Sequence, residues 1–525
     1  MFTSIVQLAG LFLGALMLIA CSDERAPLPS PIDILIINGD VYTGEKDDDA
    51  QSLDIGVDEG RIVFFGEAEG VVADRIIDAS GLVVAPGFID PHTHALDDLL
   101  SADKNHNANY LTQGVTTVFV GNDGDGPVDV AGNFEALVQN QTGTNVAAFI
   151  GHGSIRKTVL GGDDRAPTET ELETMRAMVR QAMEDGALGL SAGLYYAPAS
   201  YAKTDELIAL AREVAEFGGV YDSHLRDESS YSIGLLAAVE EALIIGRESG
   251  AAVHIAHIKA LGVDVWGQSA DVIKLVEAAQ ANGQQVTADQ YPWRASGTHV
   301  SNALIPNWVK EGSTEAFHAR LRDPELAMRL REEIGENLRK RGGAEALLIV
   351  AGRDDETGKT LSEIAEARGV DSTRAAIDIV LAGDARVASF NMREEDIKAF
   401  MTQSWVMTSS DGTNGHPRKF GSFPRKYRYY VANEKAISLD DFIRRSTGLA
   451  ADVFGLCDRG YIREGYAADL IIFDPRTFGE NATFSEPEKN SSGVVYLFVN
   501  GAMAIEDGGL KKALSGKTLR RRKCA

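Results

Sequence analysis

The sequence predicts an α/β protein, a (β/α)8 TIM-type barrel with a small β-sandwich that is formed by the N- and C-terminal segments. Two observations lead to this fold class. In the middle of the chain, short apolar runs alternate with amphipathic helical stretches over several hundred residues, which is typical of parallel strands joined by helices. Near both ends, short apolar runs are separated by Gly and Asn instead, which is typical of a small sandwich.

The first segment, residues 1–20, is predicted to be a lipoprotein-type signal peptide. Residues 8–20 form the apolar run LAGLFLGALMLIA, which is too short to span a bilayer comfortably. The run leads into the letters LIAC, which resemble the lipobox of bacterial lipoproteins, although residues 2–7 contain no Lys or Arg. The resemblance implies that Cys21 becomes the lipidated first residue and that residues 21–31 form a tether. A plain secretory signal or a membrane anchor is the alternative.

The lipobox resemblance also implies a location. A lipoprotein of this kind belongs to the bacterial cell envelope, and Ser22 after Cys21 indicates the outer membrane, facing the periplasm. The membrane is then contacted only through the lipid anchor at Cys21, since no other stretch is long and apolar enough to cross it.

The sandwich is predicted to combine residues 32–86 with residues 456–525. Its strands are predicted at 32–37, 54–57, 61–65, 81–85, 469–474 and 494–499. Turn sequences such as Asn38-Gly39 and Asn500-Gly501 follow two of these runs. Both distant segments share this pattern of short apolar runs and Gly- or Asn-containing turns, so they are predicted to pair into one unit.

The barrel is predicted over residues 87–455, between the two sandwich segments. Strands are predicted at 115–120, 146–150, 188–190, 253–258 and 285–288, and helices at 168–184 and 204–217. The helical stretches carry apolar residues at intervals of three and four. Residues 307–346 interrupt this rhythm with charged helical sequence, so an insertion is predicted there.

Composition excludes several classes of protein. The 525 residues include 51 Lys+Arg and 77 Asp+Glu, a formal net charge of −26. Such an acidic chain is a poor general nucleic-acid binder, because phosphates require a basic face. Ordinary globular composition, with 44% hydrophobic residues, excludes a disordered chain. The three cysteines, Cys21, Cys457 and Cys524, are expected to build neither a disulfide framework nor a cysteine zinc site.

The strongest chemical signal is the segment Val-Ala-Pro-Gly-Phe-Ile-Asp-Pro-His-Thr-His, which contains His92 and His94. In an extended strand, residues i and i+2 point the same way, so the two imidazoles are predicted on one side, about 6–7 Å apart. That spacing can be bridged by a metal ion. An isolated His-x-His is weak evidence, but the preceding letters make this one specific.

Three more residues follow strand-like runs. His224 and His257 each end such a run, and a single histidine of this kind is more often structural than a metal ligand. Asp411 lies in Ser-Ser-Asp-Gly after another apolar run. A carboxylate at a strand end suits a general base that faces a metal-bound water, although Ser-Asp-Gly alone is usually a turn.

The ordered set of His-x-His, His, His and Asp at strand ends is the pattern of the amidohydrolase superfamily, and further motifs make the resemblance closer. The chain resembles the N-acyl-D-amino-acid deacylase (D-aminoacylase) family from about residue 34 to about residue 501. The motifs that carry this resemblance are QGVTT at 113–117, ALGLSAGLYYAP at 187–198, HLRDE at 224–228, AHIK at 256–259, DQYP at 289–292, SDG at 410–412, HPR at 416–418 and FPR at 423–425.

This resemblance implies a zinc-dependent amidohydrolase that acts on linear amides and holds one or two zinc ions. Its implied metal ligands are His92, His94, His224 and His257. Asp411 is implied to be the catalytic acid and base. Four residues lie in motifs that help the family hold the free carboxylate of the substrate, namely Tyr196, Lys259, Tyr291 and Arg418. Tyrosine, lysine and arginine are suitable donors for a carboxylate, but each of the four has an ordinary structural role as its alternative.

The chain departs from the family at one implied metal ligand. The family usually has Gly-Asn-Cys-Gly after the second strand, whereas this sequence has Gly121-Asn122-Asp123-Gly124. Asp is a competent but harder zinc ligand than a thiolate. Three outcomes are open for Asp123: it bridges two metals, binds one metal, or binds none and forms only a turn. A ligand role is favoured.

The function implied by the resemblance is hydrolysis of N-acyl-D-amino acids to a carboxylate and a free D-amino acid. The segment between Asp411 and Arg418 looks shorter than in the family, so the preferred side chain stays open, and Arg226 is a weak candidate for binding an acidic one. Two alternatives remain. The first is a dipeptidase that cleaves before a C-terminal D-residue. The second is an inactive ligand-binding lipoprotein, which only Asp123 suggests.

Overall fold

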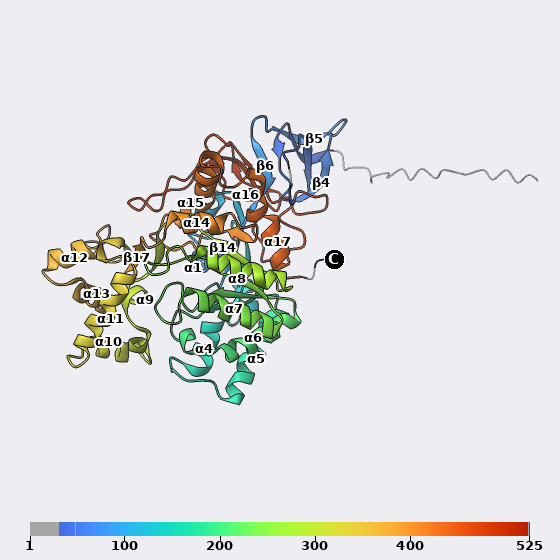
Figure 1. Cartoon of the computed structure of the whole chain (residues 1–525). Coiled ribbons are helices and arrows are strands. Elements are labelled where there is room, and N and C mark those ends of the chain that lie inside the picture. Colours follow the sequence, from blue (N-terminus) through green and yellow to red (C-terminus); the bar gives the residue numbers. More distant parts are fainter. Residues whose placement is uncertain (1–30, 48, 523, 525) are drawn as a thin grey trace, which may run out of the picture.

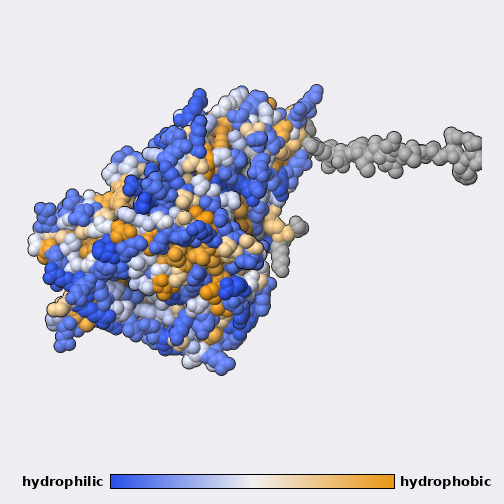
Figure 2. All heavy atoms as spheres, in the orientation of Figure 1, coloured by the Kyte–Doolittle hydropathy of each residue, from blue (hydrophilic) through white to orange (hydrophobic). Residues whose placement is uncertain are grey.

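The computed structural model describes residues 31–47, 49–522 and 524. The signal peptide, Cys21 and nearly all of the predicted tether therefore lie outside the described residues. Within the described part, none of the helices has the length and apolar character that a membrane span needs. Figure 2 shows hydrophilic side chains over most of the visible face, with smaller apolar patches between them.

The α/β class is confirmed, because parallel strands and helices alternate through the middle of the chain (Figure 1). One parallel sheet has the order β7 (Phe88–Asp90), β8 (Val115–Val120) and β9 (Asn145–Ala148). The other has the order β10 (Ile150–Gly151), β11 (Gly189–Gly193), β12 (Val220–His224), β13 (Ala252–Ile255), β14 (Val286–Gln290) and β18 (Val406–Thr408). Only Phe149 separates β9 from β10, and a parallel bridge joins Thr93 to Gly412. The carboxyl ends of the first and last strands therefore meet.

Helices connect and cover these strands. They are α1 (Leu96–Leu100), α2 (Ala108–Leu111), α3 (Val130–Asn140), α4 (His152–Leu160), α5 (Glu169–Glu184), α6 (Thr204–Glu216), α7 (Leu235–Ser249), α8 (Ser269–Ala281), α14 (Glu394–Met401), α15 (Arg418–Arg425), α16 (Leu439–Ser446) and α17 (Gly448–Phe454). The α5 sequence shows why such a helix forms. Thr168 and Glu171 make a reciprocal capping box at its start, which satisfies two otherwise unpaired backbone N–H groups. Met175, Val179 and Met183 then bury one face at four-residue spacing.

Two further sheets pack together, one of N-terminal strands alone and one of strands from both ends of the chain. Their strands are β1 (Ile32–Ile37), β2 (Asp40–Val41), β3 (Asp54–Asp58), β4 (Arg61–Gly66), β5 (Ala73–Asp78), β6 (Val83–Pro86), β19 (Leu470–Phe473), β20 (Val494–Val499), β21 (Ala502–Glu506) and β22 (Gly509–Leu510). The strand orders are β4-β3-β1-β5 and β2-β6-β19-β20-β21-β22. Strands β6 and β19 pair antiparallel. A single apolar cluster joins Ile34 and Ile55 of one sheet to Leu470 and Phe498 of the other.

The chain between β14 and β18 forms a separate unit with its own buried cluster, which includes Leu330, Ile334 and Ile349. Its elements are β15 (Ser296–His299), α9 (Val300–Leu304), α10 (Thr314–Arg322), α11 (Ala327–Lys340), β16 (Leu347–Ala351), α12 (Leu361–Arg368), α13 (Ser372–Leu381) and β17 (Arg386–Ser389). The three strands form an antiparallel sheet in the order β15-β17-β16. In Figure 1 its helices project to one side of the parallel strands. The charged segment 307–346 lies within this unit, which is wider than the sequence indicated.

The C-terminal tail is fastened across the chain by backbone hydrogen bonds and one disulfide. The amides of Gly516 and Leu519 donate to the carbonyls of Thr142 and Val146. A disulfide joins Cys457 to Cys524, with 5.1 Å between their Cα atoms. The expectation that gave these two cysteines no partner is corrected here, because their separation of 67 residues along the chain says nothing about their distance in space.

Removing this disulfide is expected to lower stability without affecting the site chemistry. The variant Cys457→Ser loses a cross-link between residues 67 positions apart, and such a loss costs about 2–4 kcal/mol because the unfolded chain gains freedom. Thermal unfolding measures the effect, and wild-type protein in reductant is the matched control. An unchanged melting temperature in both samples would contradict the expected role.

Candidate active site

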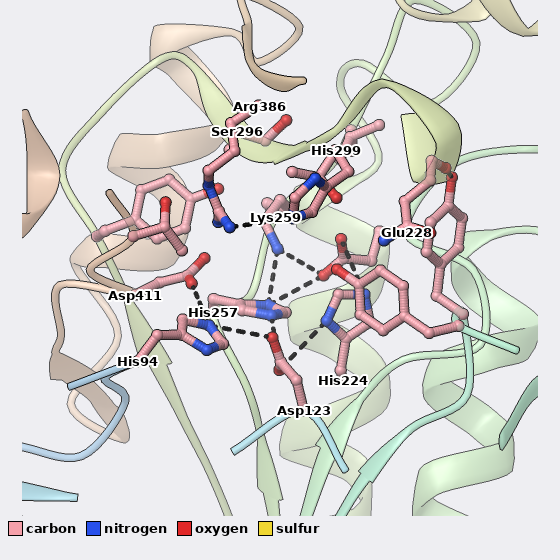
Figure 3. Close-up of a pocket in the computed structure, with 18 of the residues that line it drawn as sticks. His94, Asp123, His224, Glu228, His257, Lys259, Ser296, His299, Arg386 and Asp411 are labelled. Carbon is pink, nitrogen blue, oxygen red and sulfur yellow. Dashed lines mark hydrogen bonds and ion pairs between the residues drawn. The ribbon is translucent and has the colours of Figure 1, made fainter. Parts of the chain in front are cut away.

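A pocket of about 290 Å³ lies at the carboxyl ends of the parallel strands (Figure 3). It collects nearly all of the residues that sequence reasoning singled out. Those that line it directly are His94, Asp123, Tyr196, His224, His257, Lys259, Tyr291, Asp411 and Arg418. His92 lies fully buried behind the wall and contacts Asp123 and Asp411. The parallel strands thus bring together residues that lie more than 300 positions apart in the chain.

The strand ends place the histidines, although not always within the strand itself. Strand β7 ends at Asp90, so His92 and His94 lie in the turn that follows it, with ring centroids 5.7 Å apart. His224 is the last residue of β12. His257 lies two residues beyond β13 with a φ of 35°. The turns, rather than strand alternation alone, therefore aim these rings at the pocket.

Asp123 lies at the centre of the histidines. The distances from its Oδ1 are 3.2 Å to His257 Nε2, 3.3 Å to His224 Nδ1 and 3.4 Å to His92 Nε2, and its Oδ2 is 3.5 Å from His94 Nε2. Figure 3 shows this carboxylate below His257, between His94 and His224. One carboxylate thus lies within 3.5 Å of four imidazoles, and these side chains could hold a metal ion together.

The turn that carries Asp123 is held from two sides. Asp123 itself has a left-handed φ of 58°, which Asp tolerates better than most residues. Gly124 has a φ of 81°, and a Cβ there would lie 2.8 Å from the amide nitrogen of Gly193. The Asn122 side chain donates to the Pro91 carbonyl and to Asp222. The Gly-Asn-Asp-Gly sequence therefore fixes the direction of the carboxylate.

Both central carboxylates are held in their charged form. Burial opposes the charge on Asp123, but His92 and His257 outweigh it and hold the pKa of this carboxyl well below its usual range. Burial likewise opposes the charge on Asp411, and the Arg418 guanidinium, 2.8 Å from Asp411 Oδ2, lowers its pKa. Ionised carboxylates are the form that binds metals and accepts protons.

The donor set fits divalent metal. Two overlapping groups have ligand atoms within 4.8 Å of one another: His92, His94, Asp123 and Asp411 in one, and Asp123, His224 and His257 in the other. Both ring nitrogens of His92 and Nδ1 of His224 are buried without a hydrogen-bond partner among the described residues. Buried polar atoms of that kind are costly unless a ligand satisfies them. Because the two groups share Asp123, they could hold one ion or two.

A second buried cluster supports the first. Asp289 lies 3.6 Å from His92 Nδ1 and 3.0 Å from His254 Nε2, and it accepts a hydrogen bond from Ser409. A carboxylate behind a ligating imidazole fixes the ring orientation and raises its basicity. Asp289 is the first residue of the Asp-Gln-Tyr-Pro motif, but the motif alone does not predict its contact with His92. The only feature of the sequence that points to Asp289 is its position just before Gln290 and Tyr291, at the end of a strand.

The four implied substrate-binding residues line the pocket, but they differ in the contacts that they already make. Lys259 is committed to Glu228 at 2.5 Å and to His257 Nδ1 at 2.7 Å. The Tyr196 ring packs on His224, with ring centroids 4.7 Å apart. Arg418 lies over the Tyr291 ring, 4.6 Å from its centroid. The sequence predicted no role for several other residues that line the pocket, among them Glu228, Ser296, His299, Arg341 and Arg386.

Arg226 has a structural role and not the one suggested for it. Its guanidinium makes two hydrogen bonds to Glu241, at 2.8 and 2.9 Å, and one to the Ser200 carbonyl. It does not line the pocket that holds the histidines. Since a guanidinium paired in this bidentate way is already neutralised, Arg226 is not available for an acidic substrate.

Comparison with known proteins gives consistent matches over most of the chain. The model of the amidohydrolase family matches residues 75–290 and 319–505. A D-aminoacylase from Alcaligenes xylosoxydans xylosoxydans is 31% identical, and the match covers 94% of this chain and 98% of that protein. An N-acyl-D-aspartate deacylase from the same organism is 32% identical over 90% of this chain and 92% of that protein.

A solved structure gives the same result in three dimensions. The N-acyl-D-glutamate deacylase from Bordetella bronchiseptica, crystallised with zinc and a phosphonate inhibitor, superposes with a TM-score of 0.79 at 32% identity. The alignment covers 93% of this chain and 99% of that chain. A D-aminoacylase studied for its binuclear metal centre superposes with a TM-score of 0.80 at 30% identity, over 94% of this chain and 100% of that one.

Proposed function

Because the chain belongs to the amidohydrolase family, and within it to the N-acyl-D-amino-acid deacylases (D-aminoacylases), we propose that it hydrolyses N-acyl-D-amino acids. The products are a carboxylate and a free D-amino acid. One observation carries this conclusion: a chain that is 31% identical to a D-aminoacylase over 94% of its length gathers four histidines, Asp123 and Asp411 around one pocket.

The direct test is a hydrolysis screen. Purified protein is incubated with paired N-acetyl-D- and N-acetyl-L-amino acids, and the released amine is quantified beside the bound metal. Turnover of D-substrates with little turnover of L-substrates is expected. Dipeptides that end in a D-residue belong in the same screen, since faster turnover of those would favour the dipeptidase alternative. No turnover of any D-substrate by metal-loaded protein would refute the proposal.

We propose that the architecture is the expected (β/α)8 barrel with a sandwich from both chain ends. The strand order supports the barrel, because β7, β8, β9 with β10, β11, β12, β13, β14 and β18 follow one another, and Thr93 bridges to Gly412. The antiparallel pairing of β6 with β19 supports the sandwich. The proposed division keeps the sandwich at residues 32–86 and 456–525 and the barrel at 87–455.

We propose that the site holds zinc, as one or two ions. Zinc in the Bordetella bronchiseptica deacylase structure supports this choice, and so do the nitrogen- and oxygen-rich donors. The residues that would hold the metal are His92, His94, Asp123, His224 and His257. The chemistry that such a metal supplies when bound is polarisation of the acyl carbonyl and acidification of a water.

Asp411 is the proposed catalytic acid and base. Its carboxylate lies 3.2 Å from His94 Nε2 and 2.8 Å from Arg418 Nη1, at the edge of the metal-binding cluster. An ionised carboxylate in that place can accept the proton of the attacking water and later deliver it to the leaving amine. Arg418 pairs with Asp411 through Nη1, which keeps the carboxylate charged, while its Nε has no partner among the described residues and can meet a substrate carboxylate.

We propose that the substrate's free carboxylate binds at Tyr291 and Arg418. Lys259 and Tyr196 line the same part of the pocket and are proposed to contact the substrate as well. The Tyr291 hydroxyl supports this, because it is buried and has no hydrogen-bond partner within the described chain. Lys259 is paired with Glu228, so its contribution requires that it share its donors between Glu228 and the substrate. An ammonium group has three N–H donors and can do so.

The Tyr291→Phe variant separates binding from stability. Because the Tyr291 hydroxyl has no partner in the described structure, its removal is expected to leave the melting temperature unchanged or slightly raised. The KM for an N-acyl-D-amino acid is expected to rise about tenfold, since one hydrogen bond to a charged carboxylate is lost. Steady-state kinetics and thermal unfolding measure both effects. An unchanged KM would remove Tyr291 from the binding site.

We propose that the protein is a lipoprotein of the bacterial cell envelope, anchored at Cys21. The lipobox-like sequence supports this, and so does the Cys457–Cys524 disulfide, because disulfides persist mainly in oxidising compartments such as the periplasm. Release of the Cys21→Ser variant from the membrane fraction is the expected result, and unchanged membrane association would contradict the anchor.

A further inference from the structure

The pocket holds more positive charge than its carboxylates neutralise by direct contact. Four cationic side chains line it: Lys259, Arg341, Arg386 and Arg418. Lys259 pairs with Glu228, and Arg418 pairs with Asp411. Among the described residues, Arg341 and Arg386 form no ion pair with a carboxylate. Unpaired cations at the wall of a pocket indicate an anionic ligand.

The two unpaired arginines differ in availability. Arg341 is only 2% exposed; its Nε donates to the Ala303 carbonyl at 3.0 Å, and it lies over the Tyr231 ring. These contacts give Arg341 a role in packing the insertion unit. Arg386 is half-buried, and the only hydrogen bond of its side chain within the described chain is with His299, at 3.2 Å from Nη1 to Nε2. Most of its donors therefore remain free to meet a ligand.

His299 positions Arg386 without neutralising it. The two residues are direct partners across the antiparallel β15–β17 pair, so their side chains share one face of the sheet. Burial and the neighbouring Arg386 lower the pKa of His299, so its ring accepts a hydrogen bond in the neutral form. The nearby carboxylate of Asp384 faces the other ring nitrogen of His299, 3.8 Å from Nδ1.

Strand β15 also relates Arg386 to the proposed carboxylate site. Arg418 Nη2 donates to the carbonyl of Gly297 at 3.4 Å, and His299 lies two residues further along the same strand. Two residues of a strand span about 6–7 Å. Arg418 and Arg386 therefore contact β15 at two points, Gly297 and His299, that lie about 6–7 Å apart along the strand. In Figure 3, Arg386 and His299 lie on the wall across the pocket from Asp123.

Resting on the proposed function, we infer that Arg386 binds a carboxylate on the substrate side chain, so that the preferred substrates are N-acyl derivatives of D-aspartate and D-glutamate. Arg418 and Tyr291 take the carboxylate that every N-acyl-amino acid carries. Arg386 takes the second one, which only acidic residues have. This assigns specificity to the insertion unit, whose strand β17 supplies Arg386.

The test compares acidic substrates with their uncharged amides. In the wild type, kcat/KM for N-acetyl-D-glutamate is expected to exceed that for N-acetyl-D-glutamine by about 100-fold, the range of a hydrogen bond between charged groups. The Arg386→Gln variant is expected to lose most of this ratio through a higher KM for the acid. Arg386→Lys keeps the charge but not the bidentate fork, so an intermediate ratio is expected. The matched control is Arg331→Gln, an exposed arginine of the same unit.

The outcomes separate this inference from the proposed function. Hydrolysis of acidic and uncharged D-substrates at similar rates would overturn the role of Arg386 and leave the deacylase function intact. A wild type that hydrolyses no N-acyl-D-amino acid would overturn both. A strong acidic preference that survives in Arg386→Gln would also overturn the assignment. If both Arg386 variants unfold, inhibition of the wild type decides: free D-glutamate should inhibit far more strongly than D-glutamine, and equal inhibition refutes the inference.

Discussion

The Asp411→Asn variant is expected to lose about a thousandfold in kcat, because an amide cannot accept the proton that a general base must take. Asn has nearly the same shape as Asp, so the left-handed turn at this position, with a φ of 45°, should persist. The ion pair with Arg418, now 2.8 Å long, becomes a weaker hydrogen bond. Steady-state kinetics with an N-acetyl-D-amino acid measure the loss.

Metal content distinguishes a lost base from a lost metal. Asp411→Asn is expected to retain at least one metal ion, because the histidines and Asp123 are untouched. Asp125→Asn is the matched control, since Asp125 is an exposed carboxylate on the same pocket wall. That control should keep near-normal turnover. Near-normal hydrolysis by metal-loaded Asp411→Asn would show that another group takes the proton.

The strands and helices with a clear apolar pattern were the most predictable part of the fold. The apolar run at 115–120 coincides with β8, and the helix expected at 168–184 begins one residue later as α5. The helix has apolar residues at intervals of three and four, and the strand is a short run rich in β-branched residues between Gly114 and Gly121. Strand β15 was not predicted, because its sequence Ser-Gly-Thr-His has no apolar alternation to detect. Pairing with β17, and not local preference, makes it a strand.

The same contrast applies to the site. His224 and Asp411 were singled out through the ordered motifs of the family resemblance, and the fold brings both to one pocket. Glu228 lies in the HLRDE motif, but the motif does not show that it pairs with Lys259. Arg386 lies in no motif, and its role depends on the side chains that the fold places around it. Arg226 was a weak candidate from the sequence, and in the structure Glu241 neutralises it. Charge balance in a pocket is a property of the folded chain, so spacing could not separate these two arginines.

The Asp123→Asn variant is expected to show the other large effect, a loss of metal together with at least about a hundredfold loss of turnover. Asp123 is the one residue shared by both groups of candidate ligands, and each of its oxygens lies within 3.5 Å of an imidazole nitrogen. Loss of a supporting carboxylate alone costs about 10–100-fold in metal affinity or activity, and a direct ligand should cost more. Asn tolerates the left-handed backbone at this position, so the fold should survive.

A second substitution at the same position tests what kind of ligand is needed. Asp123→Cys supplies the thiolate that resembles the usual family residue, and it is expected to retain zinc while losing affinity for harder ions such as Mn²⁺. Metal analysis after dialysis against each ion measures this preference without relying on turnover. Asp125→Asn again serves as the control for a lost negative charge in the pocket. If Asp123→Asn bound the same number of ions as the wild type and turned over normally, Asp123 would be a turn residue only, and the cluster of imidazoles around its carboxylate would need another explanation.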